Sequence, residues 1–462
     1  MRGTSSLAAA IVLALAGTPA AFAQVQPTQP SPQTEPVDPF APPAQSPPLF
    51  DYAIGFGVGR TDNLTRSATD TVSQNILEPS FNFTFNQQGS TLQTQVVGLL
   101  QYTDYLGGYL GNEFRGQLTG QMNWVISPQR LNFVLQDYSS VEPVNTRYGN
   151  APSNQQQVNV FATGPTLAFK LGGDSGWQGQ ADLRYINTTA SKTKDFNSER
   201  GMGALRLVRD LSLTNHLSLN LEGIDVRFND ANPLAAATRY DQYNAYARYQ
   251  SNLARTDLDF ALGGSRVDFS QNQPGHSGLL ARASISWRAD ARNTLQASGV
   301  DQLADATANL VQPPDLGSAQ LTSPTVLVGR TVISPAVFRE RNISVGYGYR
   351  GDRFNFTLSP YYGQLRQLNG GDLSQNGYGV VAGMSYLLTP LTTLGVTVGD
   401  QTTEYISDNS RDRDHTATIN LSKELTPHWS WSVAFRHDQR HSTRPGFGYT
   451  ENEVFAFLYY RR

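Results

Sequence analysis

The chain has 462 residues, of which 39% are hydrophobic and 16% charged, with a formal net charge of -3 and no cysteine. A nearly neutral chain without any block of like charge excludes a nucleic-acid partner held by electrostatics, and the lack of cysteine excludes disulfides, thiolate nucleophiles and thiolate zinc sites. The 41 glycines, 21 tyrosines and 22 phenylalanines, with no long segment of helical period, favour an all-β chain.

The N-terminal segment has the pattern of an export signal. Arg2 precedes the apolar run from Leu7 to Leu15, and an A-x-A cleavage pattern ends at Ala23, which is the order of a secretory signal. We therefore expect residues 1–23 to be a signal peptide. Residues 24–49 contain nine prolines and few apolar side chains, so we expect them to stay extended or disordered in the periplasm. They serve either as a docking tether for a periplasmic partner or the cell wall, or as a plain spacer.

Residues 114–126 show most clearly what the rest of the chain is built from. Apolar side chains hold the even positions and polar side chains hold the odd ones. The apolar set is Phe114, Leu118, Met122, Trp124 and Ile126, and the polar set is Arg115, Gln117, Thr119, Gln121 and Asn123. This period of two predicts a strand with one face toward lipid and one toward a wet lumen. The run is longer than the usual strand of about five or six residues and meets the roughly 9–11 that a tilted membrane strand needs.

The same alternation recurs from Phe50 onward, in runs whose connections alternate between short and long. Short connections such as Ser127-Pro128-Gln129-Arg130 carry turn residues, and long polar stretches such as 139–156 lie between them. Ten long and nine short connections predict about 20 strands, with 18 as the alternative. Tight turns at one end and long loops at the other are typical of outer-membrane barrels, with the loops outside the cell. Residues 50–462 are therefore expected to form one transmembrane antiparallel β-barrel.

A soluble sandwich or propeller array is the alternative fold, because it also joins many strands by turns. The long runs and the lack of a repeat of fixed period argue against it. Aromatic residues near the strand ends suit the girdles that flank the apolar band of a membrane barrel. The expected girdle residues are Tyr102, Tyr105, Trp124, Trp177, Tyr185, Trp287, Tyr361, Tyr362, Trp429 and Trp431.

Four segments carry a resemblance to a known family. They are Thr61-Asp62-Asn63-Leu64-Thr65-Arg66, Phe338-Arg339-Glu340-Arg341-Asn342-Ile343, residues 353–359, and the closing Tyr449-Thr450-Glu451-Asn452-Glu453-Val454-Phe455. With them the chain resembles the β-barrel porin 2 family, exopolysaccharide-associated outer-membrane barrels of Gram-negative bacteria. The resemblance implies a barrel that works beside polysaccharide synthesis machinery, with periplasmic export or co-polymerase proteins as partners.

The chain carries few candidate catalytic or metal-binding patterns. His437 and His441 are four residues apart, but two ligands are too few for a metal site and solvated histidines are the simpler interpretation. Two groups of oxygen-bearing side chains could gather around a calcium ion, but neither has the spacing of a dedicated calcium loop. They are Asp62, Asn63 and Asp70, and Asp408, Asp412 and Asp414. The sequence also offers no Ser-His-Asp constellation. We therefore expect no enzyme activity, no metal and no cofactor.

The wet face of the predicted strands carries the informative chemistry. Residues expected to line the lumen and any substrate path are Gln93, Gln95, Gln101, Arg115, Gln117, Gln121, Asn123, Gln178, Gln180, Asp182, Arg184, Asn244, Arg248 and Gln250. Amides both donate and accept hydrogen bonds, so they suit a chain of hydroxyl groups. Equally, any water-filled lumen needs polar residues. The mixed charges argue against a strongly ion-selective porin, and Arg115, Arg184 and Arg248 are expected to set the tolerance for acidic sugars.

The longest predicted loop runs from Ala304 to Phe338 and contains four prolines. It either folds into the lumen as a constriction or stays exposed and disordered.

Two functions fit these patterns. The first is an outer-membrane conduit for export of an exopolysaccharide or capsular polysaccharide. The second is a general diffusion porin or a structural surface barrel. Either one places the chain in the outer membrane with its N-terminal segment in the periplasm, among outer-membrane lipid, lipopolysaccharide and the barrel assembly machinery.

Overall fold

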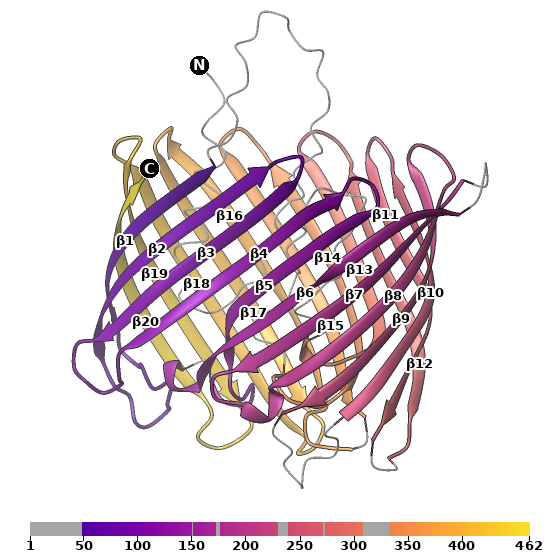
Figure 1. Cartoon of the computed structure of the whole chain (residues 1–462). Coiled ribbons are helices and arrows are strands. Elements are labelled where there is room, and N and C mark those ends of the chain that lie inside the picture. The colour runs from indigo at the N-terminus through magenta and orange to yellow at the C-terminus, as the bar shows by residue number, and fades with distance from the viewer. Residues whose placement is uncertain are drawn as a thin grey trace, which may run out of the picture.

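The computed structural model describes residues 49–149, 151–171, 176–229, 239–270, 273–307, 332–368 and 370–462. They form a sheet of 20 strands in which every pairing is antiparallel (Figure 1). β1 (Phe50–Thr61) pairs with β2 (Gln74–Gln88) on one side and with β20 (Tyr449–Arg461) on the other, which closes the sheet into a barrel. The predicted all-β barrel and its count of 20 strands are confirmed. The predicted signal peptide and nearly all of the proline-rich segment, residues 1–48, lie outside the described residues.

Each remaining strand pairs with its neighbours in sequence. Their bounds are β3 (Leu92–Tyr105), β4 (Glu113–Ser127), β5 (Leu131–Pro143), β6 (Gln155–Leu171), β7 (Trp177–Ala190), β8 (Ser198–Asp210), β9 (Asn215–Phe228), β10 (Arg239–Asn252), β11 (Thr256–Phe269), β12 (His276–Arg288), β13 (Asn293–Ala304), β14 (Phe338–Arg350), β15 (Phe354–Gln367), β16 (Gln375–Thr389), β17 (Thr392–Tyr405), β18 (Ser410–Glu424) and β19 (Trp429–Ser442). Two short 3-10 helices, η1 (Pro152–Asn154) and η2 (Lys194–Phe196), lie in loops. Within the described ranges, no helix is long and apolar enough to cross a membrane.

The barrel has a turn end and a loop end, at the top and bottom of Figure 1. At the turn end the connections are short, as between β4 and β5, where Arg130 N donates to Ser127 O at 3.0 Å and Gln129 takes a φ of 60°. The described chain starts and finishes at the turn end, where Arg461 forms an ion pair with Asp51 at 2.5 Å. Long connections lie at the loop end, as predicted.

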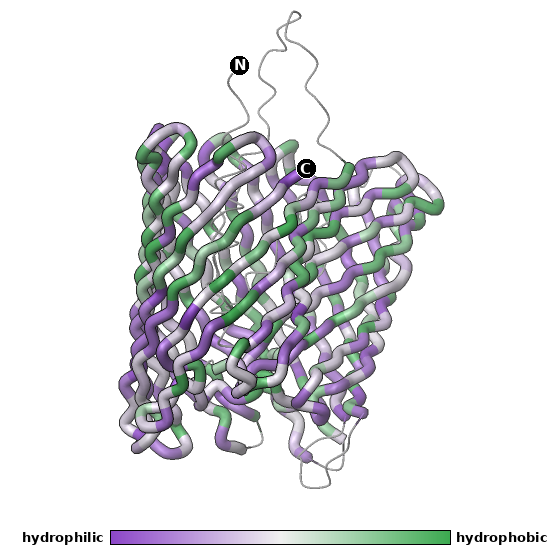
Figure 2. Tube along the Cα trace, turned by 90° about the vertical axis from the view of Figure 1, so that its left-hand side faces the viewer, coloured by the Kyte–Doolittle hydropathy of each residue, from purple (hydrophilic) through white to green (hydrophobic). Residues whose placement is uncertain are grey.

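Strand alternation sorts the side chains onto an outer and an inner face. In β4, Phe114 and Trp124 are 68% and 50% exposed on the outer face, while Arg115 and Gln117 share the inner face with Gln101 of β3. This is the register that the sequence predicts. Figure 2 shows hydrophobic stretches running across the wall and hydrophilic ones gathering toward the loop end.

Aromatic rings gather on the outer face at the turn end. The ring centroids of Phe50 and Tyr52 lie 5.7 Å apart, those of Phe81 and Phe83 lie 5.7 Å apart, and the two pairs touch across β1 and β2. Such a belt is typical of the interface between the apolar band of a membrane barrel and water.

Two of the ten expected girdle residues, Tyr105 and Tyr361, are on the inner face instead. Tyr105 is 3% exposed in an inner-wall cluster, and the Tyr361 hydroxyl donates to Gln401 Oε1 at 3.1 Å. Their prediction as girdle residues was wrong, because nearness to a strand end does not determine the face on which a side chain lies.

The seam between β1 and β20 joins glycines to aromatic rings on the inner face. Gly55, Gly57 and Gly59 lie opposite Tyr459, Phe457 and Phe455 in the ladder. The three rings stack along β20, with centroids 5.4 and 5.6 Å apart, and are at most 6% exposed. Small residues on one strand and flat rings on the next therefore fill the inner side of the closing seam.

Candidate transport lumen

All fourteen residues predicted to line the lumen lie on the inner face by strand alternation and pairing. Three of them, Gln93, Gln117 and Gln178, are exposed to the interior space, and seven are partly exposed. The other four are buried against the wall: Gln101, Gln180, Arg184 and Asn244. Whether a solute moves along the ten accessible residues stays a prediction.

The three arginines predicted to line the lumen are paired with carboxylates in the wall. Arg115 pairs with Glu113, Arg248 Nε donates to Asp259 Oδ1 at 2.8 Å, and Arg184 lies 3.0 Å from Asp182. Each of these three guanidinium groups therefore has a carboxylate beside it that offsets its positive charge.

Arg184 holds the wall together at a break in the ladder between β6 and β7. Its Nη1 donates to the carbonyl oxygens of Pro165 at 2.6 Å and Leu183 at 2.9 Å. Pro165 has no N–H to offer, and Gly164 takes a φ of 154°, where a β-carbon would lie 2.0 Å from Leu183 O. The side chain of Arg184 is 5% exposed. Arg184 thus stabilises the wall, and its expected role in tolerating acidic sugars stays a prediction.

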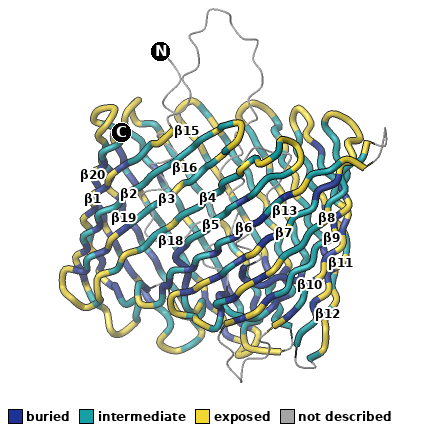
Figure 3. Tube along the Cα trace, in the orientation of Figure 1, coloured by how far each residue is buried: buried dark blue, intermediate teal, exposed yellow. Residues whose placement is uncertain are grey.

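The inner face is open toward the turn end and covered toward the loop end. Near the turn end, Gln93, Asn355 and Thr357 are exposed on the inner face. Near the loop end, Val158 and Val226 are 0% exposed although they point inward. Figure 3 shows the buried residues gathered in the lower part of the barrel and along the β1–β20 seam. Inward valines stay dry there because loops fold over them.

One of these loops, residues 144–154 between β5 and β6, reaches across the opening of the barrel at the loop end, which we call the mouth. We call this loop the bridging loop; residue 150 lies outside the described part. Its Arg147 donates to Asp372 O at 2.6 Å and to Ser407 Oγ at 2.5 Å, in the loops that follow β15 and β17. The ring of Tyr148 lies 5.3 Å from that of Phe447. The bridging loop therefore links two walls that are far apart around the barrel.

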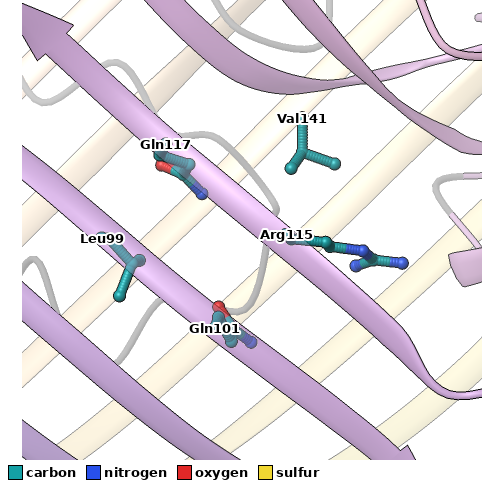
Figure 4. A pocket seen from close by; sticks show the side chains of 5 residues that line it. All are labelled: Leu99, Gln101, Arg115, Gln117 and Val141. Carbon is teal, nitrogen blue, oxygen red and sulfur yellow. The ribbon is translucent and has the colours of Figure 1, made fainter.

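The β5–β6 hairpin bends inward to bring the bridging loop across. Alternation alone would point Val141 outward, yet it lines a small recess with Leu99, Gln101, Arg115 and Gln117, which are inner-face residues of β3 and β4 (Figure 4). The ladder between β4 and β5 stops at Leu118 and Ser139. Beyond that point the amide of Gln157 takes over, donating to Gly116 O at 2.6 Å and accepting from Gly116 N at 3.2 Å. One side chain thus replaces the backbone pairing that the bend removes.

The Tyr405 ring lies against two guanidinium groups and stabilises the position of the bridging loop. The guanidinium carbons of Arg147 and Arg444 lie 5.1 and 4.9 Å from the centre of the Tyr405 ring. The Tyr405 hydroxyl donates to Thr146 O at 3.1 Å, and Arg444 Nη2 donates to Arg147 O at 2.8 Å. We call Arg147, Tyr405 and Arg444 the Tyr405 latch. Cation–π contacts and single hydrogen bonds of this kind are worth about 1 kcal/mol each.

The first loop, residues 62–73, also folds inward. Asn63 Nδ2 donates to Ser67 O at 2.8 Å and to Thr450 O at 2.9 Å, which ties the loop to β20. Arg66 forms ion pairs with Glu451 at 2.7 Å and Asp438 at 3.2 Å. Burial alone would lower the pKa of Arg66, but the surrounding Tyr449, Glu451 and Asp438 raise it above its ordinary value. This cation therefore stays charged inside the mouth.

The two described ends of the longest loop cover another part of the mouth. Of its residues, 304–307 and 332–338 are described, while 308–331 lie outside the described residues. Asp305 forms an ion pair with Arg200 at 2.6 Å and accepts a hydrogen bond from Tyr240 at 2.9 Å. Ala306 and Ile333 pack in one cluster with Val158 and Phe196. The two described ends of this loop thus line the inner wall, while the choice between a constriction and an exposed loop falls on residues outside the described part.

Sequence reasoning missed the buried ion pairs at the loop end. Asp412 accepts from Arg444 at 2.6 Å, and Asp414 pairs with Arg440 at 2.6 Å. Asp412 and Asp414, considered above for calcium, are thus held by arginines, and the described residues contain no group of three or more metal-ligating side chains. The sequence does contain a signal for such pairs. Arg436, Asp438 and Arg440 occupy every second position of β19, so residues of opposite charge follow one another along the same face of the strand.

Comparisons with known proteins leave the family open. No protein-family model matches the sequence, and no curated protein is significantly similar to it. Among solved structures, the barrel is similar to a mutant of the ferric enterobactin receptor PfeA from Pseudomonas aeruginosa, with 11% identity, a TM-score of 0.46, and coverage of 89% of this chain and 80% of that one. The FrpB iron transporter from Neisseria meningitidis is 10% identical with a TM-score of 0.45, and the match covers 89% of this chain and 82% of that one. The siderophore receptor PirA from Pseudomonas aeruginosa is 10% identical with a TM-score of 0.43, and the match covers 90% of this chain and 81% of that one. Values this low leave the function to be argued from the residues of this barrel.

Proposed function

We propose that this protein is an outer-membrane conduit through which an exopolysaccharide leaves the cell, with its turn end in the periplasm and its loop end outside. The observation that carries the proposal is the polarity of the interior along its axis. A water-exposed, amide-rich wall at the turn end leads to a loop end whose inner face is buried under loops, one of which reaches across to the far wall. That arrangement suits a path entered from one side and gated at the other.

The outer face supports placement in a membrane. Ile54, Phe56 and Val58 of β1 are about half exposed on it, and a closed barrel is one of the only two architectures that satisfy backbone hydrogen bonds inside a bilayer. Aromatic rings mark the turn end of this face, whereas arginine–carboxylate pairs such as Arg413 with Asp400 mark the loop end.

The inner wall supports a neutral or weakly charged, hydroxyl-rich cargo. Each amide–hydroxyl bond exchanges for a bond to water and nets only about 0.5–1.5 kcal/mol, so a chain held by many of them slides without being trapped. Paired charges such as Arg115 with Glu113 add no strong preference for one sign. The resemblance to exopolysaccharide-associated barrels supports the same cargo class, and it adds a periplasmic export or co-polymerase protein as the partner that supplies the chain.

Gating at the loop end would protect the periplasm between episodes of export. The bridging loop is held to the far wall by hydrogen bonds and ring contacts. The first loop is held to the neighbouring strands β19 and β20 by ion pairs, and the ends of the long loop are held by an ion pair and by apolar packing. The contacts of the partly exposed Arg147 separate more readily than a packed apolar core, because its polar groups regain water when they part. An advancing polymer would supply the contacts that replace them.

Deletion of the gene, followed by complementation, tests this proposal. The deletion strain should lose surface polysaccharide and accumulate polymer in the periplasm, and the wild-type gene should restore export. A matched control is Arg266→Ala, which changes an outer-face arginine paired with Asp268 and should restore export fully. Surface polysaccharide that is undiminished in the deletion strain, together with reduced uptake of small solutes, would favour the general diffusion porin instead.

A further inference from the structure

Three arginines meet on the outer face of β13, β14 and β15 near the loop end. Arg339 of β14 lies directly opposite Arg366 of β15, and Arg341 lies opposite Asp301 of β13. The intervening residue Glu340 faces inward, where it accepts from Gln302 at 3.2 Å. Alternation therefore places all three guanidinium groups and Asp301 on the outside.

The single carboxylate does not balance this group. Asp301 accepts from Arg339 Nε at 2.9 Å and from Arg341 Nε at 3.1 Å. The hydrogen-bond partners of Arg366 are neutral, namely the carbonyls of Leu365 and Gln375, both at 3.0 Å, and Asn376 Oδ1 at 2.6 Å. Three cations and one anion leave a local excess of two positive charges. Like charges directly opposite each other destabilise a sheet pair, so Arg339 and Arg366 are better placed when an anion lies between them.

The rows next to the arginines are apolar and exposed. On β14, Arg341 is followed on the same face by Ile343 and Val345, which are 56% and 43% exposed. On β15, Arg366 and Gln364 are followed by Tyr362, which is 41% exposed. A molecule lying along this face from the loop end toward the turn end would meet cations first and an apolar surface next.

We propose that Arg339, Arg341 and Arg366 bind the phosphate of an outer-leaflet glycolipid, with its acyl chains along Ile343, Val345 and Tyr362. Guanidinium groups bind phosphate through paired, charge-assisted hydrogen bonds, and the apolar rows fit the chains that such a headgroup carries. This site rests on the membrane orientation proposed above and not on the cargo. It also assigns a role to the Phe338–Ile343 segment, whose arginines the conduit does not use.

A binding assay on the folded barrel in detergent tests the site. Lipid A carrying both phosphates, dephosphorylated lipid A and inorganic phosphate are added in separate titrations and followed by native mass spectrometry. Lipid A should bind, dephosphorylated lipid A should bind about tenfold more weakly, and inorganic phosphate should bind more weakly still, because the apolar contacts contribute as well.

Two variants locate the site. Arg339→Ala/Arg341→Ala/Arg366→Ala should weaken lipid A binding by about tenfold or more, since it removes every charged donor. Arg266→Ala, where one arginine meets one aspartate, should bind as wild type does. Folding of each variant is checked by heat-modifiable migration, and Arg341→Ala alone is measured in the same way if the triple variant does not fold.

Equal binding of lipid A by wild type and by the Arg339→Ala/Arg341→Ala/Arg366→Ala variant would overturn the proposal, as would equal binding of phosphorylated and dephosphorylated lipid. Inorganic phosphate binding as tightly as lipid A would overturn the assignment to a lipid. The assay requires no transport, so its failure leaves the export test unaffected, and a failed export test leaves this one standing.

Discussion

The ring of Phe457 lies on Gly57, its partner across the β1–β20 seam, so closely that a β-carbon at position 57 would lie 2.2 Å from ring atom Cε1. Gly55 and Gly59 meet Tyr459 and Phe455 in the same way. The last strand thus closes the barrel by laying three rings on three residues without side chains. Close approach of this kind stabilises glycine-containing strands by covering their backbone.

Replacing Gly57 with alanine should therefore weaken closure of the barrel. The added methyl group displaces the ring or separates the strands, at a cost of about 1–3 kcal/mol. Heat-modifiable migration should show unfolding of Gly57→Ala at a lower temperature than wild type. Gly201→Ala is the control, because its β-carbon would meet open space. Combining Gly57→Ala with Phe457→Ala should cost less than the sum of the two changes, and simple additivity would show that the contact does not matter.

Breaking the Tyr405 latch should open the mouth. Arg147→Ala with Arg444→Ala removes both guanidinium contacts to the ring, and losing about 2 kcal/mol in total changes the ratio of closed to open mouths by roughly thirtyfold. Single channels in planar bilayers should spend more time in a state of high conductance. Arg266→Ala on the outer face should behave as wild type does, and a latch variant with unchanged conductance would show that the bridging loop is not a gate.

Neutralising the acids that compensate the wall arginines should create selectivity. In Glu113→Gln with Asp259→Asn, Arg115 and Arg248 lose their carboxylates, so the lumen becomes positive and attracts anions. The reversal potential in a potassium chloride gradient should shift toward chloride. Arg115→Gln with Arg248→Gln should shift it toward potassium. Equal potentials in wild type and both variants would mean that ions do not pass along this wall.

The loop contact at Asp408 should withstand moderate acid. Hydrogen bonds from Ser410, with smaller effects from Arg147 and Arg444, hold the pKa of the Asp408 carboxyl below its ordinary value of 3.8. A lowered pKa in the folded state means that the contact is complete above 3.8 and is lost as the pH falls through the lower value. The contribution of this contact to channel conductance should therefore stay constant from neutral pH down to 3.8 and be lost only below it. Asp408→Asn should change this acid response, and an identical response in that variant would rule out Asp408 as its source.

Much of this architecture follows from local patterns. Alternation assigns Phe114 outward and Arg115 inward, because a strand has only two faces and lipid accepts only one kind of side chain. Turn chemistry such as Ser127–Arg130 fixes the number of strands. These features depend only on residues that are close together in the sequence, so the sequence alone predicts them.

The closed mouth depends on contacts that local patterns do not contain. Arg147 meets Tyr405 and Arg444 only because the β5–β6 hairpin bends inward, and that bend rests on the side chain of Gln157 replacing a ladder bond. Arg184 looks like a lumen residue by its position, but the missing N–H of Pro165 directs it into the wall. Alternation gives the face of a residue, whereas burial on that face depends on loops that come from elsewhere in the chain.

Release of polysaccharide from vesicles tests the conduit most directly. Vesicles carrying the purified barrel and filled with a neutral, labelled polysaccharide are compared with vesicles of lipid alone and with vesicles carrying the Arg147→Ala/Arg444→Ala variant. The account predicts slow release through wild type, faster release through the latch variant, and retention in lipid alone. Retention of the polysaccharide by both barrels, while small ions still pass through them, would contradict it.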